Sequence, residues 1–150
     1  LRPNFIVGPV PSNYRESLIY NFIAAAMEKG FIELAGDGSF EREWMHPEDI
    51  AEAVKLAILE QQEGCETLIL SDPENRLTMM DLAKRITRVV GKGYVTTQPT
   101  LEGFSLKSSG ERARQRLNWR PKVDVDTIIQ QVWEGYQRDV GQKDRSHHGG

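Results

Sequence analysis

The stretch GDGSFEREWMHPEDIAEA, residues 36–53, contains the local signals that decide the fold. It opens with a Gly-Asp-Gly sequence that is typical of a turn, and the residues that follow can run as an extended segment up to His46. Pro47 is a favoured first residue of a helix, and Glu48 and Asp49 lie where the helix dipole favours acidic side chains. The stretch therefore predicts a turn, an extended segment and a helix in direct succession.

Strands and helices alternate on both sides of this stretch. Short apolar runs predict strands at residues 1–7, 31–34, 67–70 and 94–97. Apolar residues at helical spacing predict helices at residues 18–27, 47–58, 78–90, 110–117 and 128–136. Such alternation predicts an α/β fold in which flanking helices cover short parallel or mixed strands.

Three polar or glycine signals mark the ends of the predicted elements. Asn13 followed by Glu16 has the character of a capping box, which predicts the start of the first helix. Gly30 and Gly91 stand where two of the helices are expected to end.

The apolar run at residues 1–7 predicts a strand that is buried in the protein.

The composition fits one domain of 150 residues and excludes several classes of function. With 19 basic and 22 acidic residues the formal net charge is -3, so the chain lacks the basic surface that nucleic acid requires. No apolar run approaches the roughly 20 residues that cross a bilayer, so we expect no membrane partner. The one cysteine, Cys65, excludes an internal disulfide, and a cytoplasmic location is the default expectation.

The sequence contains none of the common catalytic or nucleotide-binding motifs. It lacks G-x-G-x-x-G, the P-loop pattern and the G-x-S-x-G elbow. Cys65 has no second ligand at metal-binding spacing, and His147 and His148 lie near the polar C-terminus. His46 is a lone histidine before a helix, and the capping of that helix is favoured over catalysis. We therefore expect no catalytic residue and no metal site in this chain.

Four segments together carry a family resemblance. They are LRPNFIVGP (residues 1–9), the stretch at 36–53, TLIL with LTMMDLA (67–70 and 77–83), and RLNWRP (116–121). In order and spacing they resemble the C-terminal, substrate-binding part of an extended short-chain dehydrogenase/reductase, of the NAD(P)-dependent epimerase/dehydratase family. The resemblance covers residues 1–141 and implies a Rossmann-like fold, and residues 142–150 are expected to form a disordered polar tail.

The resemblance implies that the chain is one part of a longer parent protein. In the family, the dinucleotide fingerprint and the tyrosine–lysine catalytic pair precede the segment that residues 1–9 match, and no tyrosine here has a lysine four residues on. We accordingly interpret Leu1 as an internal point of the parent. NAD or NADP would be bound mainly by the N-terminal half, and a homodimer of the parent would be consistent with the family.

Arg42 matches the family arginine that neutralises the diphosphate of the substrate. A guanidinium stays charged and can donate two parallel hydrogen bonds to phosphate oxygens, which suits that role. The alternative interpretation is a solvated arginine whose charge is balanced by Glu41 and Glu43 on either side.

The resemblance also assigns binding roles to other residues of two predicted strands. Pro3 would lie beside the cofactor, and Asn4 and Phe5 beside the sugar. Family members often carry asparagine at the position of Phe5, whereas Asn4 is offset by one residue, which turns a side chain to the other face of a strand. A core position for Phe5 is the alternative. Glu33 to Ala35 match a strand whose main chain meets the nucleotide base.

These features leave two functions open. The first is a substrate-binding lobe of an NAD(P)-dependent epimerase, dehydratase or reductase that acts on a nucleotide sugar, which could also serve as an isolated binding module. The second is a non-catalytic sensor or interaction module of the same fold. The departure at Phe5 favours the second function, as does the lack of a second family arginine in residues 100–107. The nearby Arg112, Arg114 and Arg116 are typical of a solvated basic helix face.

Overall fold

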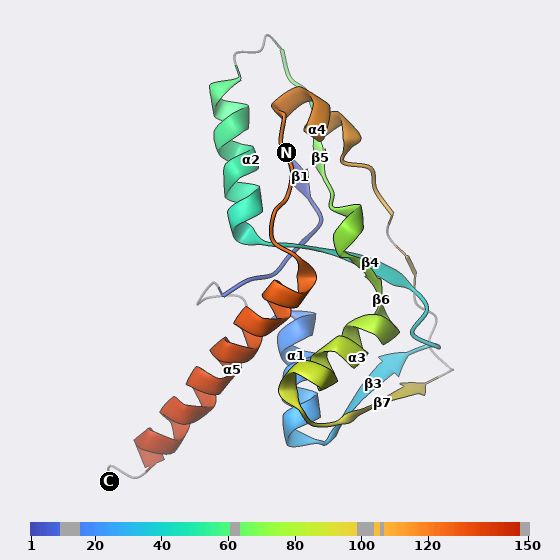
Figure 1. The fold of residues 1–150 in the computed structure, drawn as a ribbon, viewed down its shortest axis with the longest axis vertical. Coiled ribbons are helices and arrows are strands. Elements are labelled where there is room, and N and C mark those ends of the chain that lie inside the picture. Colours follow the sequence, from blue (N-terminus) through green and yellow to red (C-terminus); the bar gives the residue numbers. More distant parts are fainter. Residues whose placement is uncertain (10–15, 61–63, 99–103, 106, 148–150) are drawn as a thin grey trace.

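The computed structural model describes residues 1–9, 16–60, 64–98, 104–105 and 107–147, and Figure 1 shows its fold. The helices are α1 (Leu18–Glu28), α2 (Pro47–Leu59), the short 3-10 helix η2 (Pro73–Asn75), α3 (Met79–Val90), α4 (Glu111–Leu117) and α5 (Val125–His147). The strands are β1 (Arg2–Pro3), β2 (Phe5–Ile6), β3 (Phe31–Ala35), β4 (Glu41–Met45), β5 (Ile69–Leu70), β6 (Arg76–Thr78) and β7 (Tyr94–Gln98).

Within the described residues the strands form three small sheets. β1 pairs with β5 and β3 pairs with β7, both in parallel. The third sheet has the order β2-β4-β6, with β2 parallel and β6 antiparallel to β4. Each parallel pair has at least one helix in the sequence between its strands, which is the usual crossover for parallel pairing. The predicted α/β fold with short parallel and mixed strands is confirmed.

Strand β4 lies between two hydrophobic cores. Trp44 belongs to the core that α1, α3 and α5 share, whereas the adjacent Met45 belongs to the core of α2, β5 and α4. Figure 1 shows β4 running from the part of the molecule that contains α3 and β3 toward the start of α2. Successive side chains of a strand point to opposite faces, so one strand can supply neighbouring residues to both cores.

The ends of the helices follow their local sequence. The side chains of His46 and Thr78 cap α2 and α3 by accepting hydrogen bonds from backbone N–H groups in the first turns. The predicted capping role of His46 is confirmed, and its ring also bonds to Gln131 at 2.8 Å. The first helix begins later than Asn13 and Glu16 predicted, with Ser17 as its cap, and Asn13 itself lies outside the described residues.

Two buried polar side chains hold the segment that joins α4 to α5. The Asp49 carboxylate accepts hydrogen bonds from the backbone N–H groups of Lys122 and Val123. The backbone carbonyl of Asp49 accepts a 2.9 Å hydrogen bond from the Trp119 indole. Asn75 bonds to the same segment through the Val123 carbonyl and the N–H at the start of α5. These bonds fix α5 against the body of the protein and make Trp119 a structural residue.

The structure corrects three predictions. Residues 1–7 form two short strands with exposed side chains, because β1 and β2 each pair along one edge and neither is covered on both faces. Strand β6 was not predicted, since its three residues carry no alternating pattern. Helix α5 extends to His147, so residues 142–147 are helical where the sequence predicted a disordered tail.

Candidate functional site

An open pocket of about 380 Å³ lies where β2, β4 and the start of α1 meet. The residues that line it are Phe5, Ile6, Val7, Glu16, Ser17, Leu18, Arg42 and Trp44. Two predicted site residues, Phe5 and Arg42, are therefore brought together although 36 residues separate them in the sequence. A concave, mostly apolar pocket with a few polar groups is the usual form of a small-molecule site.

The alternation of β4 explains how these side chains come to share one face. Arg42 and Trp44 are two positions apart on the strand, so both point to the same side of the sheet. Phe5 is the register partner of Trp44 in the neighbouring β2, and their rings lie 5.8 Å apart between centroids. Phe5 is 42% exposed, so the alternative reading of Phe5 as a core residue is wrong.

Aromatic rings surround the Arg42 guanidinium. Its central carbon lies 4.4 Å from the ring centroid of Phe104, 5.2 Å from that of Phe5 and 5.6 Å from that of Phe40. The guanidinium also donates a 2.9 Å hydrogen bond to the Phe104 carbonyl. Contacts with aromatic faces leave the in-plane N–H groups of an arginine available, so Arg42 is held in place while part of its donor edge can still bind an anion.

The start of α1 adds backbone donors to the pocket wall, whereas the indole N–H of Trp44 is buried. Trp44 is 2% exposed, and its indole N–H has no hydrogen-bond partner among the described residues. The first turn of α1 begins at Leu18, where backbone N–H groups and the helix dipole favour a negative charge. The Glu16 carboxylate opposes this effect from the same wall. The pocket thus combines one cation with neutral donors in apolar surroundings.

The opposite face of β4 carries a buried polar network centred on Glu43, which is 1% exposed. One carboxylate oxygen of Glu43 is bonded to the Arg76 guanidinium. The other oxygen accepts 2.6 Å hydrogen bonds from Asn4 and from Ser71. Ser108 closes the network, with its hydroxyl 2.8 Å from the Asn4 amide and its carbonyl bonded to Ser71 and Arg76.

These contacts correct the proposed balance of charges around Arg42. Glu43 forms its ion pair with Arg76 on the other face of the strand, and Glu41 forms one with Lys107. Among the described residues, neither acidic neighbour forms an ion pair with Arg42. Sequence proximity was misleading here, because adjacent residues of a strand point in opposite directions.

The other predicted site residues lie outside the lining of this pocket. The Asn4 side chain belongs to the Glu43 network, and Pro3 lies in β1 opposite Leu70. Glu33 and Ala35 lie in β3, where they pair with Thr96 and Gln98 of β7. Their predicted contacts with sugar, cofactor and base stay predictions. Sequence reasoning missed Trp44, which an alternation count from Arg42 along β4 could have placed on the same face.

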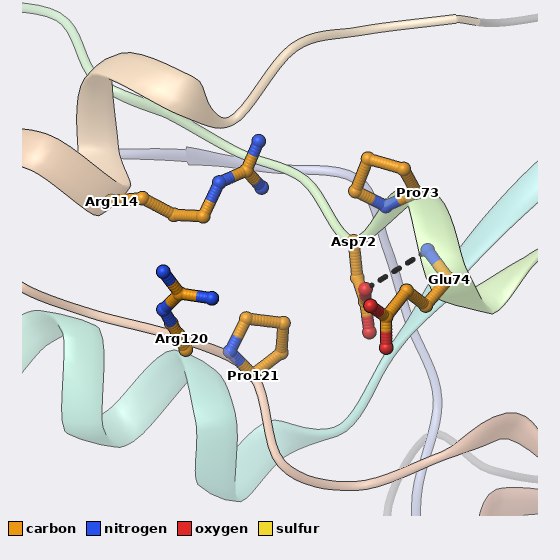
Figure 2. A pocket seen from close by; sticks show the side chains of 6 residues that line it. All are labelled: Asp72, Pro73, Glu74, Arg114, Arg120 and Pro121. Carbon is orange, nitrogen blue, oxygen red and sulfur yellow. Dashed lines mark hydrogen bonds between the residues drawn. The ribbon is translucent and has the colours of Figure 1, made fainter.

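A second, smaller pocket of about 260 Å³ is lined by residues that follow β5 and by the segment around α4. Figure 2 shows the guanidinium groups of Arg114 and Arg120 on one side and the carboxylates of Asp72 and Glu74 on the other. Burial raises the pKa of the Asp72 carboxyl above its ordinary value, and a hydrogen bond from the Glu74 N–H opposes that shift. Arg114 already bonds to Glu111 and to the Ser71 carbonyl, so its positive charge is partly neutralised within the protein.

The part of the chain that the structure describes offers no group of three or more histidine, cysteine, aspartate or glutamate residues that could hold a metal ion. Within the same residues, no helix is long and apolar enough to cross a bilayer.

Comparisons with known proteins bear on the family and the fold of this chain. The chain matches the family model described as NAD dependent epimerase/dehydratase family over residues 1–69. It is 30% identical over 145 residues to a protein of the GDP-L-fucose synthase type from Oryza sativa subsp. japonica, which covers 91% of this chain and 41% of that protein. It is 29% identical over 127 residues to dTDP-glucose 4,6-dehydratase of Streptomyces niveus, covering 81% of this chain and 37% of that protein. The chain thus spans about two fifths of the length of these relatives.

Solved structures share the fold. The epimerase Mth375 of Methanothermobacter thermautotrophicus superposes with a TM-score of 0.79 at 24% identity, covering 97% of this chain and 44% of that protein. MoeE5 in complex with UDP-glucuronic acid and NAD superposes with a TM-score of 0.78 at 16% identity, covering 92% of this chain and 46% of that protein. At these identities the likeness is one of fold.

Proposed function

Because the chain belongs to the NAD-dependent epimerase/dehydratase family, we propose that it is the C-terminal, substrate-binding part of an NAD(P)-dependent enzyme that acts on a nucleotide sugar. The observation that carries this proposal is Arg42 on the wall of an apolar pocket, held by aromatic rings with part of its donor edge free. A fixed guanidinium is well suited to the diphosphate of a nucleoside-diphosphate sugar.

The remaining walls suit the uncharged part of such a ligand. Phe5, Ile6 and Val7 present apolar surface, on which the less polar face of a sugar ring can pack. The start of α1 places backbone N–H groups on the same pocket. A ligand that is anionic at one end and neutral at the other matches this distribution of charge.

The residues of this chain make no complete dinucleotide site. The sequence has no glycine-rich phosphate loop, and the one residue assigned to the cofactor, Pro3, has no N–H to donate. The cofactor would exchange hydride with the substrate when bound, and its binding site would lie mainly in another part of the parent protein. The contribution of this chain is to bind and orient the sugar nucleotide.

The test is a titration of the ¹⁵N-labelled chain with UDP-glucose, dTDP-glucose and GDP-L-fucose, followed by two-dimensional NMR. We expect at least one of these ligands to shift the backbone signals of Phe5, Leu18 and Arg42 in a saturable way. Signals from residues of the second pocket, such as Arg120, should stay in place and provide the internal control.

A chain that binds none of the three ligands would contradict the proposal. That result would favour the non-catalytic sensor or interaction module, which the aromatic cover of Arg42 also suits, because an arginine enclosed by Phe5 and Phe104 can serve a purely structural role. Binding of UDP as strong as that of UDP-glucose would support a phosphate site and argue against a sugar subsite.

A further inference from the structure

The second pocket, about 260 Å³ in volume, carries opposite charges on its two sides. The Arg114 and Arg120 guanidinium groups lie on one side, and the Asp72 and Glu74 carboxylates lie on the other (Figure 2). Among the described residues, Arg120 and the Glu74 carboxylate form no hydrogen bond or ion pair. The pocket shares no lining residue with the pocket of Arg42, so the function proposed above leaves these charges unused.

Asp72 lines this pocket with one carboxylate oxygen that is both accessible and unpaired. The residue is 8% exposed, and its Oδ1 accepts a 3.2 Å hydrogen bond from the Glu74 N–H. Oδ2 has no partner among the described residues and is not enclosed, because the one enclosed side-chain polar atom without a partner there is the Trp44 nitrogen. Burial raises the pKa of the Asp72 carboxyl; the Glu74 N–H opposes this shift, and the Glu74 and Asp49 carboxylates add to it. A buried carboxylate in this state gains from a cation that reaches its free oxygen.

Both charged sides stand on a fixed backbone. The Asp72 side chain caps η2, and the first residue of that helix, Pro73, has a fixed φ. Arg120 lies between Pro121 and the buried Trp119, whose indole is hydrogen-bonded within the protein. A ligand would meet charges that are already in position, so little of its affinity would be lost to ordering the chain.

We propose that the second pocket binds a free α-amino acid, with the ligand carboxylate on the Arg120 guanidinium and the ligand ammonium group on Asp72 and Glu74. A guanidinium can donate two parallel hydrogen bonds to a carboxylate. A simple anion or a simple cation would meet like charges on one side of the pocket, whereas a zwitterion matches both sides. The volume lies below the roughly 300 Å³ at which sites for drug-sized molecules begin, which suits a small ligand. This inference does not rest on the proposed nucleotide-sugar function.

The experiment titrates the ¹⁵N-labelled chain, at neutral pH and constant ionic strength, with L-alanine, propionate and ethylamine. Propionate is L-alanine without its ammonium group, and ethylamine is L-alanine without its carboxylate. We expect L-alanine to shift the backbone signals of Asp72, Glu74 and Arg120 in a saturable way, with a Kd of about 1 mM. Loss of either charged group removes a charge-assisted hydrogen bond, so propionate and ethylamine should each bind about 10-fold or more weakly.

Two substitutions in the pocket and one outside it locate the binding. Arg120→Met removes the partner of the ligand carboxylate, Asp72→Asn removes the charge that attracts the ammonium group, and each should weaken L-alanine binding by about 10-fold. Asp72→Asn keeps an acceptor for the Glu74 N–H. The control Arg112→Met removes an arginine that pairs with Glu66 and lines neither pocket, so the affinity should stay unchanged. A thermal melt of each variant verifies that it is folded.

Several results would overturn the proposal. If L-alanine shifts none of the three signals, the charges of the pocket serve the fold alone. Ethylamine that binds as tightly as L-alanine would make this a cation site, and propionate that does so would make it an anion site. An equal loss from Arg112→Met and Arg120→Met would indicate non-specific attraction. The nucleotide-sugar function is judged separately, from the signals of Phe5, Leu18 and Arg42.

Discussion

On one face of β4, each oxygen of the Glu43 carboxylate accepts hydrogen bonds from other parts of the chain; on the other face, the Trp44 indole has no acceptor among the described residues. The two residues are adjacent in sequence and almost equally buried, at 1% and 2% exposed. Equal burial therefore does not show whether a polar group is paired within the protein, and only its hydrogen-bond partners do.

The same contrast applies to the two arginines nearest the strand. Arg76 forms an ion pair with the buried Glu43 carboxylate, and this pair joins β6 to β4. Arg42 contacts aromatic rings and one backbone carbonyl, so its charge has no counter-ion among the described residues. A positive charge without a counter-ion beside a pocket favours the binding of an anion, whereas a paired one serves the fold.

The sharpest way to break this comparison is Glu43→Ala. The substitution leaves Arg76 without its counter-ion and removes one of the two acceptors that Asn4 and Ser71 each have, so we expect the free energy of unfolding to fall by about 3–5 kcal/mol. Urea denaturation measures it. The matched control is Glu41→Ala, which removes an exposed pair with Lys107 and should cost less than about 1 kcal/mol. Similar losses for the two variants would show that the network is not structural.

The substitution Arg42→Met tests the face of β4 that lies opposite Glu43. Because the guanidinium has no internal counter-ion, we expect the free energy of unfolding to change by less than about 1 kcal/mol. Affinity for a nucleotide sugar should fall by about 10- to 100-fold, as expected for the loss of a charge-assisted bond to phosphate. Calorimetric titration measures the affinity. Arg120→Met, in the second pocket, should leave it unchanged, and an equal loss there would indicate non-specific attraction of anions.

Phe104→Ala and Phe104→Leu sharpen the role of the rings around Arg42. The Phe104 ring is 64% exposed and lies closest to the guanidinium, so its removal should free the arginine side chain and weaken nucleotide-sugar binding by about 2- to 5-fold. Leucine keeps bulk without an aromatic face and should restore little of this loss. Stronger binding by the alanine variant would mean that Phe104 competes with the ligand for Arg42.

The smallest expected effect is the pH dependence that Asp72 contributes. Burial raises the pKa of its carboxyl in the folded state, so the folded protein holds this proton more tightly than the unfolded chain does. The resulting stability is present below the ordinary pKa of aspartate and is lost as the pH rises through the raised value. Asp72→Asn keeps the acceptor for the Glu74 N–H. We expect the thermal midpoint of Asp72→Asn minus that of the wild type to increase by about 1–2 °C between pH 3 and pH 7. A difference that is the same at both pH values would contradict this expectation.

The sequence predicted most of the fold because its signals are local. The glycine at the end of α3, the proline at the start of α2 and the spacing of apolar residues each depend on a few neighbouring residues, and the structure confirms the helices they predicted. Strand β6 and the exposure of β1 and β2 depend on which strands pair, and pairing is a property of residues far apart in the chain.

The candidate site was predictable in part for the same reason. The resemblance singled out Arg42 and Phe5, and the structure brings both to one pocket. The different hydrogen bonding of Glu43 and Trp44 could not be predicted from the sequence, because it depends on partners such as Ser71 and Arg76 that fold onto β4 from elsewhere.

The strand pairings described above also determine how slowly this chain should fold. Arg2 pairs with Ile69, Phe5 with Trp44 and Phe31 with Tyr94, so each parallel pair must close a long loop before it gains any stability. A chain of such high contact order folds in milliseconds to seconds, in contrast to a helical bundle of the same size. During synthesis on a ribosome, β3 cannot pair until β7 has been synthesised. Until then its apolar residues Phe31, Ile32 and Leu34 would be accessible to chaperones.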